Sequence, residues 1–258
     1  MELTVMTEGT KDSILNELIA MSHHLGEEQR ELLIIGEGNT SARIDDDTFY
    51  VKASGNNLRT IAAEGFVKIS RSKVLKLLES NATDADVKRV LSESRVDPAV
   101  KSQPSVETVL HGALYELTDA RFIGHSHPIA VNAIMCSTRS QDILGHLMPD
   151  EIVVCGVASV YIPYTDPGLP LAREVAKRVK EFQSKWGEQP RTMYLQNHGL
   201  FAIGRSAREV QNISAMAVKH ARVLATTYTV GGPNFLSEHE ISRIHTRPDE
   251  EVRRNQFK

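Results

Sequence analysis

The spacing of hydrophobic residues predicts an amphipathic helix near the start of the chain. Between Asp12 and Gln29, apolar side chains recur every three to four residues, at Ile14, Leu15, Leu18, Ile19 and Met21. Gly26 favours the end of the helix, because glycine readily adopts the left-handed conformation found just after a last helical turn. We therefore expect one face of this helix to pack on the core.

The remainder of the chain mixes short strand patterns with helix patterns. Strands are predicted at Leu32–Ile35, Ser41–Ile44, Phe49–Val51, Arg121–Gly124, Ile152–Cys155, Ser159–Ile162, Met193–Leu195 and Leu200–Ile203. Helices are predicted at Ser72–Ser80, Asp84–Ser94, Ser105–Leu117, Ile129–Met135, Leu169–Gln183 and Ala207–Tyr228. Tight turns between short strands favour a mixed, largely antiparallel sheet covered by helices on both faces, an α/β fold.

Composition places few further limits on the protein. With 258 residues, 41% of them hydrophobic, residues 1–230 can form one domain, and residues 231–258 a charged tail that is exposed or contacts another subunit. The formal charge of −3 gives no broad attraction to nucleic acid or an anionic membrane. We expect no signal peptide and no membrane span, and hence a cytoplasmic protein. Cys136 and Cys155 are isolated and are expected to be buried.

Three histidines are candidate metal ligands. His125 and His127 are two residues apart at the end of an apolar strand, so both rings can point to the same side of the sheet. His198 lies between two predicted strands beside Gly199, where the backbone can approach a metal closely. A catalytic zinc site uses three protein ligands and keeps one position open. The spacing alone also fits unrelated turn histidines, and we assign the chain's other histidines, including His111, His146 and His220, to structure or solvent.

Other polar motifs permit two interpretations each. Glu107 begins a helix, where a carboxylate either pairs with the helix dipole or acts as a general base near the metal. The loops at residues 36–41 and 52–55, rich in glycine and hydroxyl groups, either bind phosphate or form ordinary hairpin turns.

Five motifs in this order resemble the class II aldolase/adducin family: Gly38-Asn39-Thr40-Ser41, Lys52-Ala53-Ser54-Gly55, Pro104-Ser105-Val106-Glu107, His125-Ser126-His127-Pro128 and Asn197-His198-Gly199. The resemblance implies a three-layer α/β/α sandwich, often a cyclic homotetramer with active sites between subunits. It further implies that His125, His127 and His198 bind Zn²⁺ or another divalent metal, and that Glu107 is the acid/base. By the same resemblance, Asn39, Ser54, Gly55 and Ser105 would hold the substrate phosphate, and Tyr164 would protonate the aldehyde oxygen in a neighbouring subunit's site.

The activity that this resemblance implies is cleavage of a ketose 1-phosphate to dihydroxyacetone phosphate and an aldehyde. The metal would stabilise the negative charge of the enediolate that forms when the carbon-carbon bond breaks. A decarboxylase of a 3-oxo acid phosphate is the alternative, because loss of carbon dioxide gives a similar enediolate. Family epimerases carry Asp where Glu107 stands, and adducin-like modules lack the metal histidines.

Two features depart from a simple match to the family aldolases. Ser105-Val106 and Ser54-Gly55 stand where family aldolases often carry two serines or Thr-Gly, so a substrate carboxylate could replace the phosphate. The tail resembles the end of the aldolase half of bifunctional rhamnulose-phosphate aldolase/dehydrogenases, and we expect no dehydrogenase half.

Overall fold

A computed structural model describes residues 8–257, with side chains from residue 13 onward. Its α-helices are α1 (Glu8–Leu25), α2 (Arg71–Leu75), α3 (Asp84–Glu93), α4 (Thr108–Leu117), α5 (Ile129–Met135), α6 (Pro149–Cys155), α7 (Leu169–Trp186), α8 (Ala207–Thr227), α9 (Glu238–Thr246) and α10 (Pro248–Gln256). Its strands are β1 (Asn39–Arg43), β2 (Thr48–Lys52), β3 (Phe66–Ser70), β4 (Phe122–Ser126), β5 (Val160–Ile162), β6 (Thr192–Leu195) and β7 (Gly199–Gly204).

The strands form one sheet in the order β3-β2-β1-β4-β7-β6-β5. Every neighbouring pair is antiparallel except β5 and β6, which run parallel. Strands β1, β4 and β7 therefore lie side by side at the centre of the sheet, although more than 70 residues separate each from the next along the chain. The predicted mixed, largely antiparallel sheet is confirmed.

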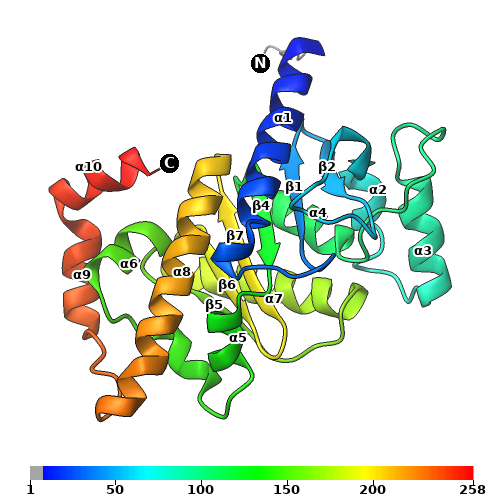
Figure 1. Cartoon of the computed structure of the whole chain (residues 1–258). Coiled ribbons are helices and arrows are strands. Elements are labelled where there is room, and N and C mark those ends of the chain that lie inside the picture. Colours follow the sequence, from blue (N-terminus) through cyan, green and yellow to red (C-terminus); the bar gives the residue numbers. More distant parts are fainter. Residues whose placement is uncertain (1–7, 258) are drawn as a thin grey trace.

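Helices cover both faces of this sheet (Figure 1). Side chains alternate between the faces along each strand: Phe122 and Ala202 pack with α1 and α8, whereas Ile123 and Phe201 pack with α4 and α7. The result is the expected three-layer α/β/α sandwich, with a hydrophobic core on each side of the sheet.

The local structure differs from the sequence-based prediction in three places. The run Ile152–Cys155 forms the last turn of helix α6 instead of a strand. All four residues are buried, so the run shows no helical periodicity in the sequence. The segment Leu32–Ile35 is a turn in which Ile35 has φ of 56°. Strand β3 was not predicted. The other strand predictions and the long helices are confirmed to within a few residues. Gly26 follows α1 directly, but its φ is not in the left-handed region; a Cβ atom there would instead collide with the Arg59 backbone.

The C-terminal tail folds back on its own chain. Helices α9 and α10 lie against α6 (Figure 1). Arg253 pairs with Asp150 at 2.8 Å, and the Asn212 side chain donates to the Phe257 carbonyl at 3.1 Å. The charged run at the end of the sequence is thus helix α10, and a contact of this tail with another subunit stays a prediction.

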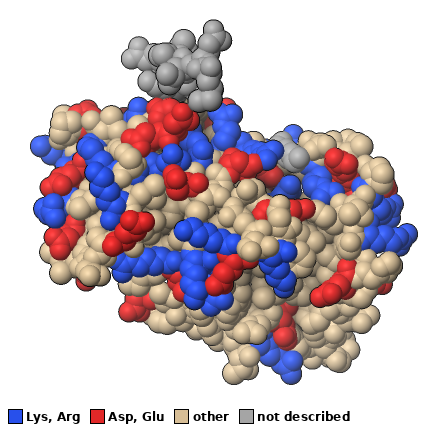
Figure 2. Space-filling model, turned by 180° about the vertical axis from the view of Figure 1, so that it is seen from behind, with Lys and Arg blue, Asp and Glu red and all other residues tan. Residues whose placement is uncertain are grey.

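Figure 2 shows acidic and basic side chains intermixed over the back of the molecule. Within residues 8–257, no helix has both the length and the apolar character needed to cross a bilayer.

Cys155 is buried as predicted, whereas Cys136 is exposed, because it follows the last residue of the short helix α5.

A buried carboxylate joins two helices on the α8 side of the sheet. Glu151 of α6 accepts a hydrogen bond from His146 at 2.9 Å and lies 3.0 Å from Nδ1 of His220 in α8. Burial alone would raise the pKa of Glu151, but hydrogen bonds from the two histidines outweigh it and lower this pKa to about 2. Burial opposes the charged form of His146 too, yet the hydrogen bond and charge of Glu151 raise its pKa above the ordinary value.

These shifts predict a stability maximum in mildly acidic solution. The Glu151 contribution is present above the unfolded carboxyl pKa of 4.5 and is lost as pH falls toward 2. The His146 contribution is present below 6.5 and is lost as pH rises through the raised folded pKa. We expect Glu151→Gln to lower the free energy of unfolding of the metal-free protein by about 3–5 kcal/mol near pH 6, with a smaller loss at pH 9.

Urea denaturation between pH 4 and pH 9 measures this difference. Glu188→Gln is the control, because Glu188 also pairs with a histidine, His245, but is 42% exposed. This control should change stability by less than about 1 kcal/mol at any pH. A loss in Glu151→Gln that is the same at pH 6 and pH 9 would contradict the prediction.

Candidate metal centre

The three central strands bring the predicted ligands together. His125 of β4 lies opposite Asn39 of β1 and Phe201 of β7, and its ring stacks on Phe201 with centroids 4.2 Å apart. His198 lies in the turn between β6 and β7. One ring nitrogen from each of His125, His127 and His198 falls within 4.8 Å of the others, so the spacing fits one shared metal ion.

Two glycines allow this close approach. A Cβ atom at Gly199 would collide with the Ser126 backbone and the His127 ring. Gly38 has φ of 67°, and a Cβ there would collide with the His125 carbonyl. Asn132 of α5 also donates to the His198 carbonyl at 3.0 Å, which ties the third ligand to the helix that follows His127.

The hydrogen-bond partners of His125 and His127 indicate which of their ring nitrogens carry hydrogen. Nδ1 of His125 faces the Leu200 carbonyl at 3.1 Å, and Nδ1 of His127 faces the Glu37 carboxylate at 3.2 Å. Both Nδ1 atoms must therefore carry hydrogen, since carbonyl and carboxylate oxygens only accept. The two Nε2 atoms, 3.0 Å apart, then present lone pairs to each other, an arrangement that a cation between them would relieve.

The protonation states agree with this arrangement. Burial, and then the neighbouring histidines, lower the pKa of His125 well below its ordinary value. The same causes lower the pKa of His198 to about 4. Neutral imidazoles are the form that binds metals, so the three side chains fit a divalent transition metal.

Glu107 lies against this group. Its Oε2 is 3.3 Å from Nε2 of His125 and its Oε1 is 3.4 Å from Nε2 of His198. Asn39 donates to Oε2 at 2.6 Å, whereas Oε1 is buried without a hydrogen-bond partner among the described residues. Burial raises the pKa of Glu107 to about 7, against the lowering effect of Asn39 and Lys52. A carboxyl group with such a pKa can both take up and release a proton near neutral pH.

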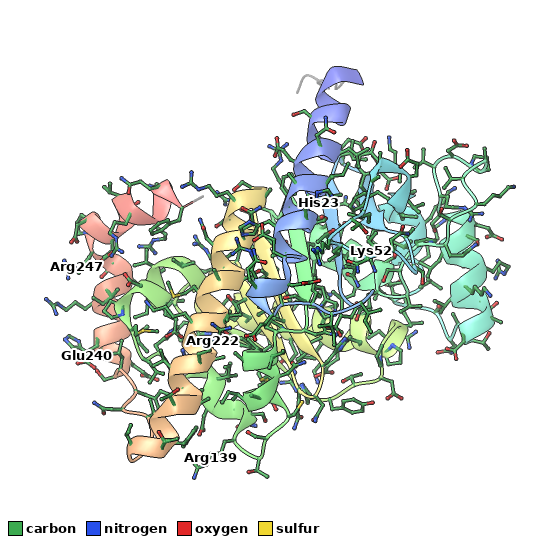
Figure 3. All side chains as sticks on the ribbon, viewed as in Figure 1. His23, Lys52, Arg139, Arg222, Glu240 and Arg247 are labelled. Atoms are coloured by element: carbon green, nitrogen blue, oxygen red, sulfur yellow. The ribbon has the colours of Figure 1, made fainter. Side chains whose placement is uncertain are left out.

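Two charged residues of the predicted loops have contacts that the sequence did not reveal. Lys52, the last residue of β2 (labelled in Figure 3), is buried. Its ammonium donates to the carbonyls of Gly36 and Gly38 at 2.9 and 3.0 Å. Glu37, which lies between these two glycines, accepts from the Ile34 N–H at 2.7 Å and from His127. Lys52 therefore holds the loop that carries Glu37 to the metal ligand. An acidic residue between two glycines was the only signal in the sequence.

We expect the Glu37 carboxylate to strengthen metal binding by fixing the His127 ring and increasing its basicity. Outer partners of this kind change metal affinity by about 10–100-fold when they are removed. Glu37→Ala should therefore raise the Kd for Zn²⁺ by that factor, measured by competition with a chelating dye. Glu31→Ala is the matched control, because this nearby carboxylate pairs with Arg222 at the surface. Equal Kd values for Glu37→Ala and Glu31→Ala would exclude the role.

The residues expected to bind phosphate lie along the same edge of the site. Ser54 N–H bonds to the Gln103 carbonyl at 2.8 Å, and Ser105 N–H bonds to the Lys52 carbonyl at 3.1 Å, so the two predicted motifs form one bridged loop pair. Ser54 and Gly55 are exposed. The Asn39 amide donates to Ser105 at 3.3 Å in addition to Glu107.

Tyr164 lies apart from this group. Its side chain is 59% exposed, its hydroxyl donates to Asp166 at 3.1 Å, and its N–H bonds to Gln196. Within one chain, the described contacts do not link it to the histidines. Beside His127, by contrast, the exposed side chains of Ile34 and Ile129 line a pocket of about 300 Å³.

A known family accounts for most of this chain. Residues 16–225 match the model of the class II aldolase and adducin N-terminal domain. The chain belongs to the class II aldolase and adducin family. The resemblance that the five sequence motifs indicated is thereby confirmed.

Curated members of the class II aldolase family differ in the reactions that they are named for. A methylthioribulose-1-phosphate dehydratase of Geobacillus thermodenitrificans is 31% identical over 206 residues, covering 76% of this chain and 83% of that protein. A 3-oxo-tetronate 4-phosphate decarboxylase of Haemophilus influenzae is 24% identical, covering 85% of this chain and 90% of that protein. The chain spans only 27% of the uncharacterized oxidoreductase YuxG of Bacillus subtilis, which is 25% identical over 202 residues and 75% of this chain.

Solved structures of class II aldolases share the fold. The N-terminal class II aldolase domain of a conserved Thermoplasma acidophilum protein has a TM-score of 0.66 and 27% identity, covering 87% of this chain and all of that one. An L-fuculose 1-phosphate aldolase has a TM-score of 0.68 and 18% identity, covering 90% of this chain and 94% of that one. The second similarity concerns the fold alone.

Proposed function

We propose that this chain is a metal-dependent lyase that cleaves a ketose 1-phosphate to dihydroxyacetone phosphate and an aldehyde. The observation that carries the proposal is the convergence of ring nitrogens from His125, His127 and His198 within 4.8 Å of one another, with the buried Glu107 carboxyl 3.3 Å from His125. Together they place a set of potential metal-binding nitrogens beside a group that can exchange a proton. A non-catalytic, adducin-like role would need neither.

His125, His127 and His198 would hold the metal, for which we propose Zn²⁺. When bound, it would act as a Lewis acid that polarises the ketone of the substrate and stabilises negative charge beside it. Three imidazole ligands suit zinc and also other divalent transition metals, and they leave a coordination position open.

The proton transfers fall to residues of the chain. When the bond between the carbon beside the ketone and the following carbon breaks, the bonding electron pair stays with the ketone fragment. Glu107 would then deliver a proton to the carbon beside the ketone. Its Oε1, which lacks a hydrogen-bond partner among residues 13–257, is the atom available for this step. We propose that Tyr164 of a neighbouring subunit exchanges the proton on the aldehyde oxygen, since the side chain is exposed and its hydroxyl bonds to Asp166 instead of to a residue of the histidine group.

The phosphate would lie against the bridged loop pair. Ser54 and Gly55 are exposed there, and the Ser105 hydroxyl lies next to Asn39. Asn39 would reach a phosphate by releasing Ser105, its longer contact, while keeping Glu107 at 2.6 Å. The buried Lys52 ammonium beneath the first loop adds positive charge on this side.

We further propose a cytoplasmic homotetramer with sites between subunits. The proposal is supported by the exposure of Tyr164 and of the apolar residues Ile34 and Ile129 next to the metal centre. Residues 231–258 would add to the subunit contacts as an extension of the catalytic domain at residues 1–230.

Dehydration is a second candidate, favoured by the 31% identity to a methylthioribulose-1-phosphate dehydratase. That protein is named for a ketose 1-phosphate as well, and loss of water beside a ketone also requires a base such as Glu107. Decarboxylation of a 3-oxo acid phosphate is a third, because one relative carries that name.

One assay separates these reactions. Zinc-loaded protein is incubated with rhamnulose, fuculose, ribulose and methylthioribulose 1-phosphates and with a 3-oxo acid phosphate, with and without a chelator. Release of dihydroxyacetone phosphate that the chelator abolishes would support the proposal. A product lighter by one water would favour the dehydratase, and carbon dioxide release the decarboxylase. No reaction by protein with bound metal would overturn the proposal of a lyase of this substrate class.

A further inference from the structure

Five buried polar side chains form a continuous hydrogen-bonded chain that ends at Glu107. The Tyr115 hydroxyl lies 2.7 Å from Ser41 Oγ, which lies 2.6 Å from Nδ1 of His111. Nε2 of His111 bonds to Oδ1 of Asn39, whose Nδ2 donates to Glu107 Oε2 at 2.6 Å. All five side chains are buried, so water does not compete for these contacts.

When Glu107 is ionised, the chemistry of each group fixes which atom donates and which accepts in every hydrogen bond of this series. The carboxylate needs a donor, so the NH₂ group of Asn39 faces Glu107 and its oxygen faces His111. Nε2 of His111 must then carry hydrogen. Since burial keeps this imidazole neutral, with its pKa lowered to about 3, Nδ1 is an acceptor for the Ser41 hydroxyl. Ser41 in turn accepts from the Tyr115 hydroxyl.

We infer that His111 is a positioning residue, whose Nε2–H fixes the Asn39 amide so that its NH₂ group, and not its oxygen, faces Glu107. An unfixed amide could turn over and place its oxygen against the carboxylate. The hydrogen bond from Asn39 is charge-assisted and therefore strong, and it holds Oε2 in place. This series of hydrogen bonds engages only Oε2 of Glu107. Oε1, which has no hydrogen-bond partner among the described residues, is left as the atom that exchanges a proton with substrate.

This inference rests on the proposed role of Glu107 as acid/base, but its first test needs no substrate. In zinc-loaded protein with ¹⁵N-labelled histidine, nitrogen and proton shifts report which ring nitrogen of His111 carries hydrogen. We expect the neutral Nε2–H form throughout pH 6–8, with the signal assigned by its loss in His111→Gln. An Nδ1–H form would make Nε2 an acceptor, so that the NH₂ group of Asn39 would face His111, and this would overturn the inference. An imidazolium would overturn it equally.

The second test uses two variants of His111 in the zinc-loaded enzyme. Glutamine can place an N–H near the position of Nε2, whereas asparagine is too short to reach Asn39. We expect His111→Asn to lower kcat by about tenfold or more with a KM within about twofold, and His111→Gln to restore kcat to within about threefold. Thr118→Val, which removes a buried hydroxyl near the end of the same helix, should leave kcat unchanged.

Equal losses of kcat in the Asn and Gln variants, or normal kcat in His111→Asn, would contradict the positioning role. Thermal denaturation of each variant identifies losses caused by unfolding. If the wild-type enzyme is inactive on every substrate, the proposed function fails, while the tautomer of His111 still decides the orientation of Asn39. An active enzyme in which His111 is the Nδ1–H tautomer would instead contradict only the positioning role of His111.

Discussion

Glu107→Gln is expected to lower kcat by about 10²–10⁴-fold while the protein keeps its fold and its metal. The substitution is nearly isosteric, and the new amide oxygen can still accept from Asn39. It cannot, however, exchange a proton with the carbon beside the ketone. Steady-state kinetics on the substrate identified by the chelator assay measure the loss, and metal analysis checks that about one ion per chain remains.

Glu116→Gln provides the matched control for this variant. Glu116 lies on the same helix, α4, but is exposed and pairs with Arg71 at 3.3 Å. Its turnover should equal that of the wild type. Near-normal turnover in Glu107→Gln would remove Glu107 from the proton transfer and leave the metal alone to account for the reaction.

His198→Ala is expected to abolish tight metal binding. The change removes one of three nitrogen ligands, so the affinity for Zn²⁺ should fall by more than the about 10–100-fold typical of losing an outer partner. Because His198 lies in a turn and is partly exposed, the fold should survive. Metal analysis after dialysis should give well below about one ion per chain, and activity should be lost in parallel.

A histidine outside the centre tests the specificity of this effect. His239 is exposed on α9, in the C-terminal tail, and His239→Ala should keep the metal and the activity of the wild type. If His198→Ala retained a full complement of metal, the three-histidine centre would be wrong as described, and Glu107 would be the first residue to examine as a replacement ligand.

The sequence was sufficient to predict the parts of the fold that depend on local pattern. Helices α7 and α8 have strong hydrophobic periodicity, and β6 and β7 are short apolar runs on either side of the turn that holds His198. The helix α6 was missed because its run of Ile and Val is buried all round, so that composition suggested a strand.

The candidate site could be predicted only where its residues form short motifs. His125 and His127 were proposed from their spacing, His198 from its turn beside Gly199 and Glu107 from its place at a helix start, and the ordered motifs then added to the case for all four. The roles of Glu37 and His111 were not predicted, because their partners His127 and Asn39 lie 90 and 72 residues away along the chain. Such contacts depend on strand register, which a single sequence does not determine.

The order of the central strands also bears on when the protein could take up the proposed metal ion. Strands β1, β4 and β7 meet only after long stretches of chain have closed, and contacts between such distant segments form slowly in folding. A chain still emerging from the ribosome has His125 and His127 but not His198, and so would hold only two of the three proposed ligands. Capture of an ion by all three would therefore wait for the last third of the polypeptide, and it would link that third to the middle third.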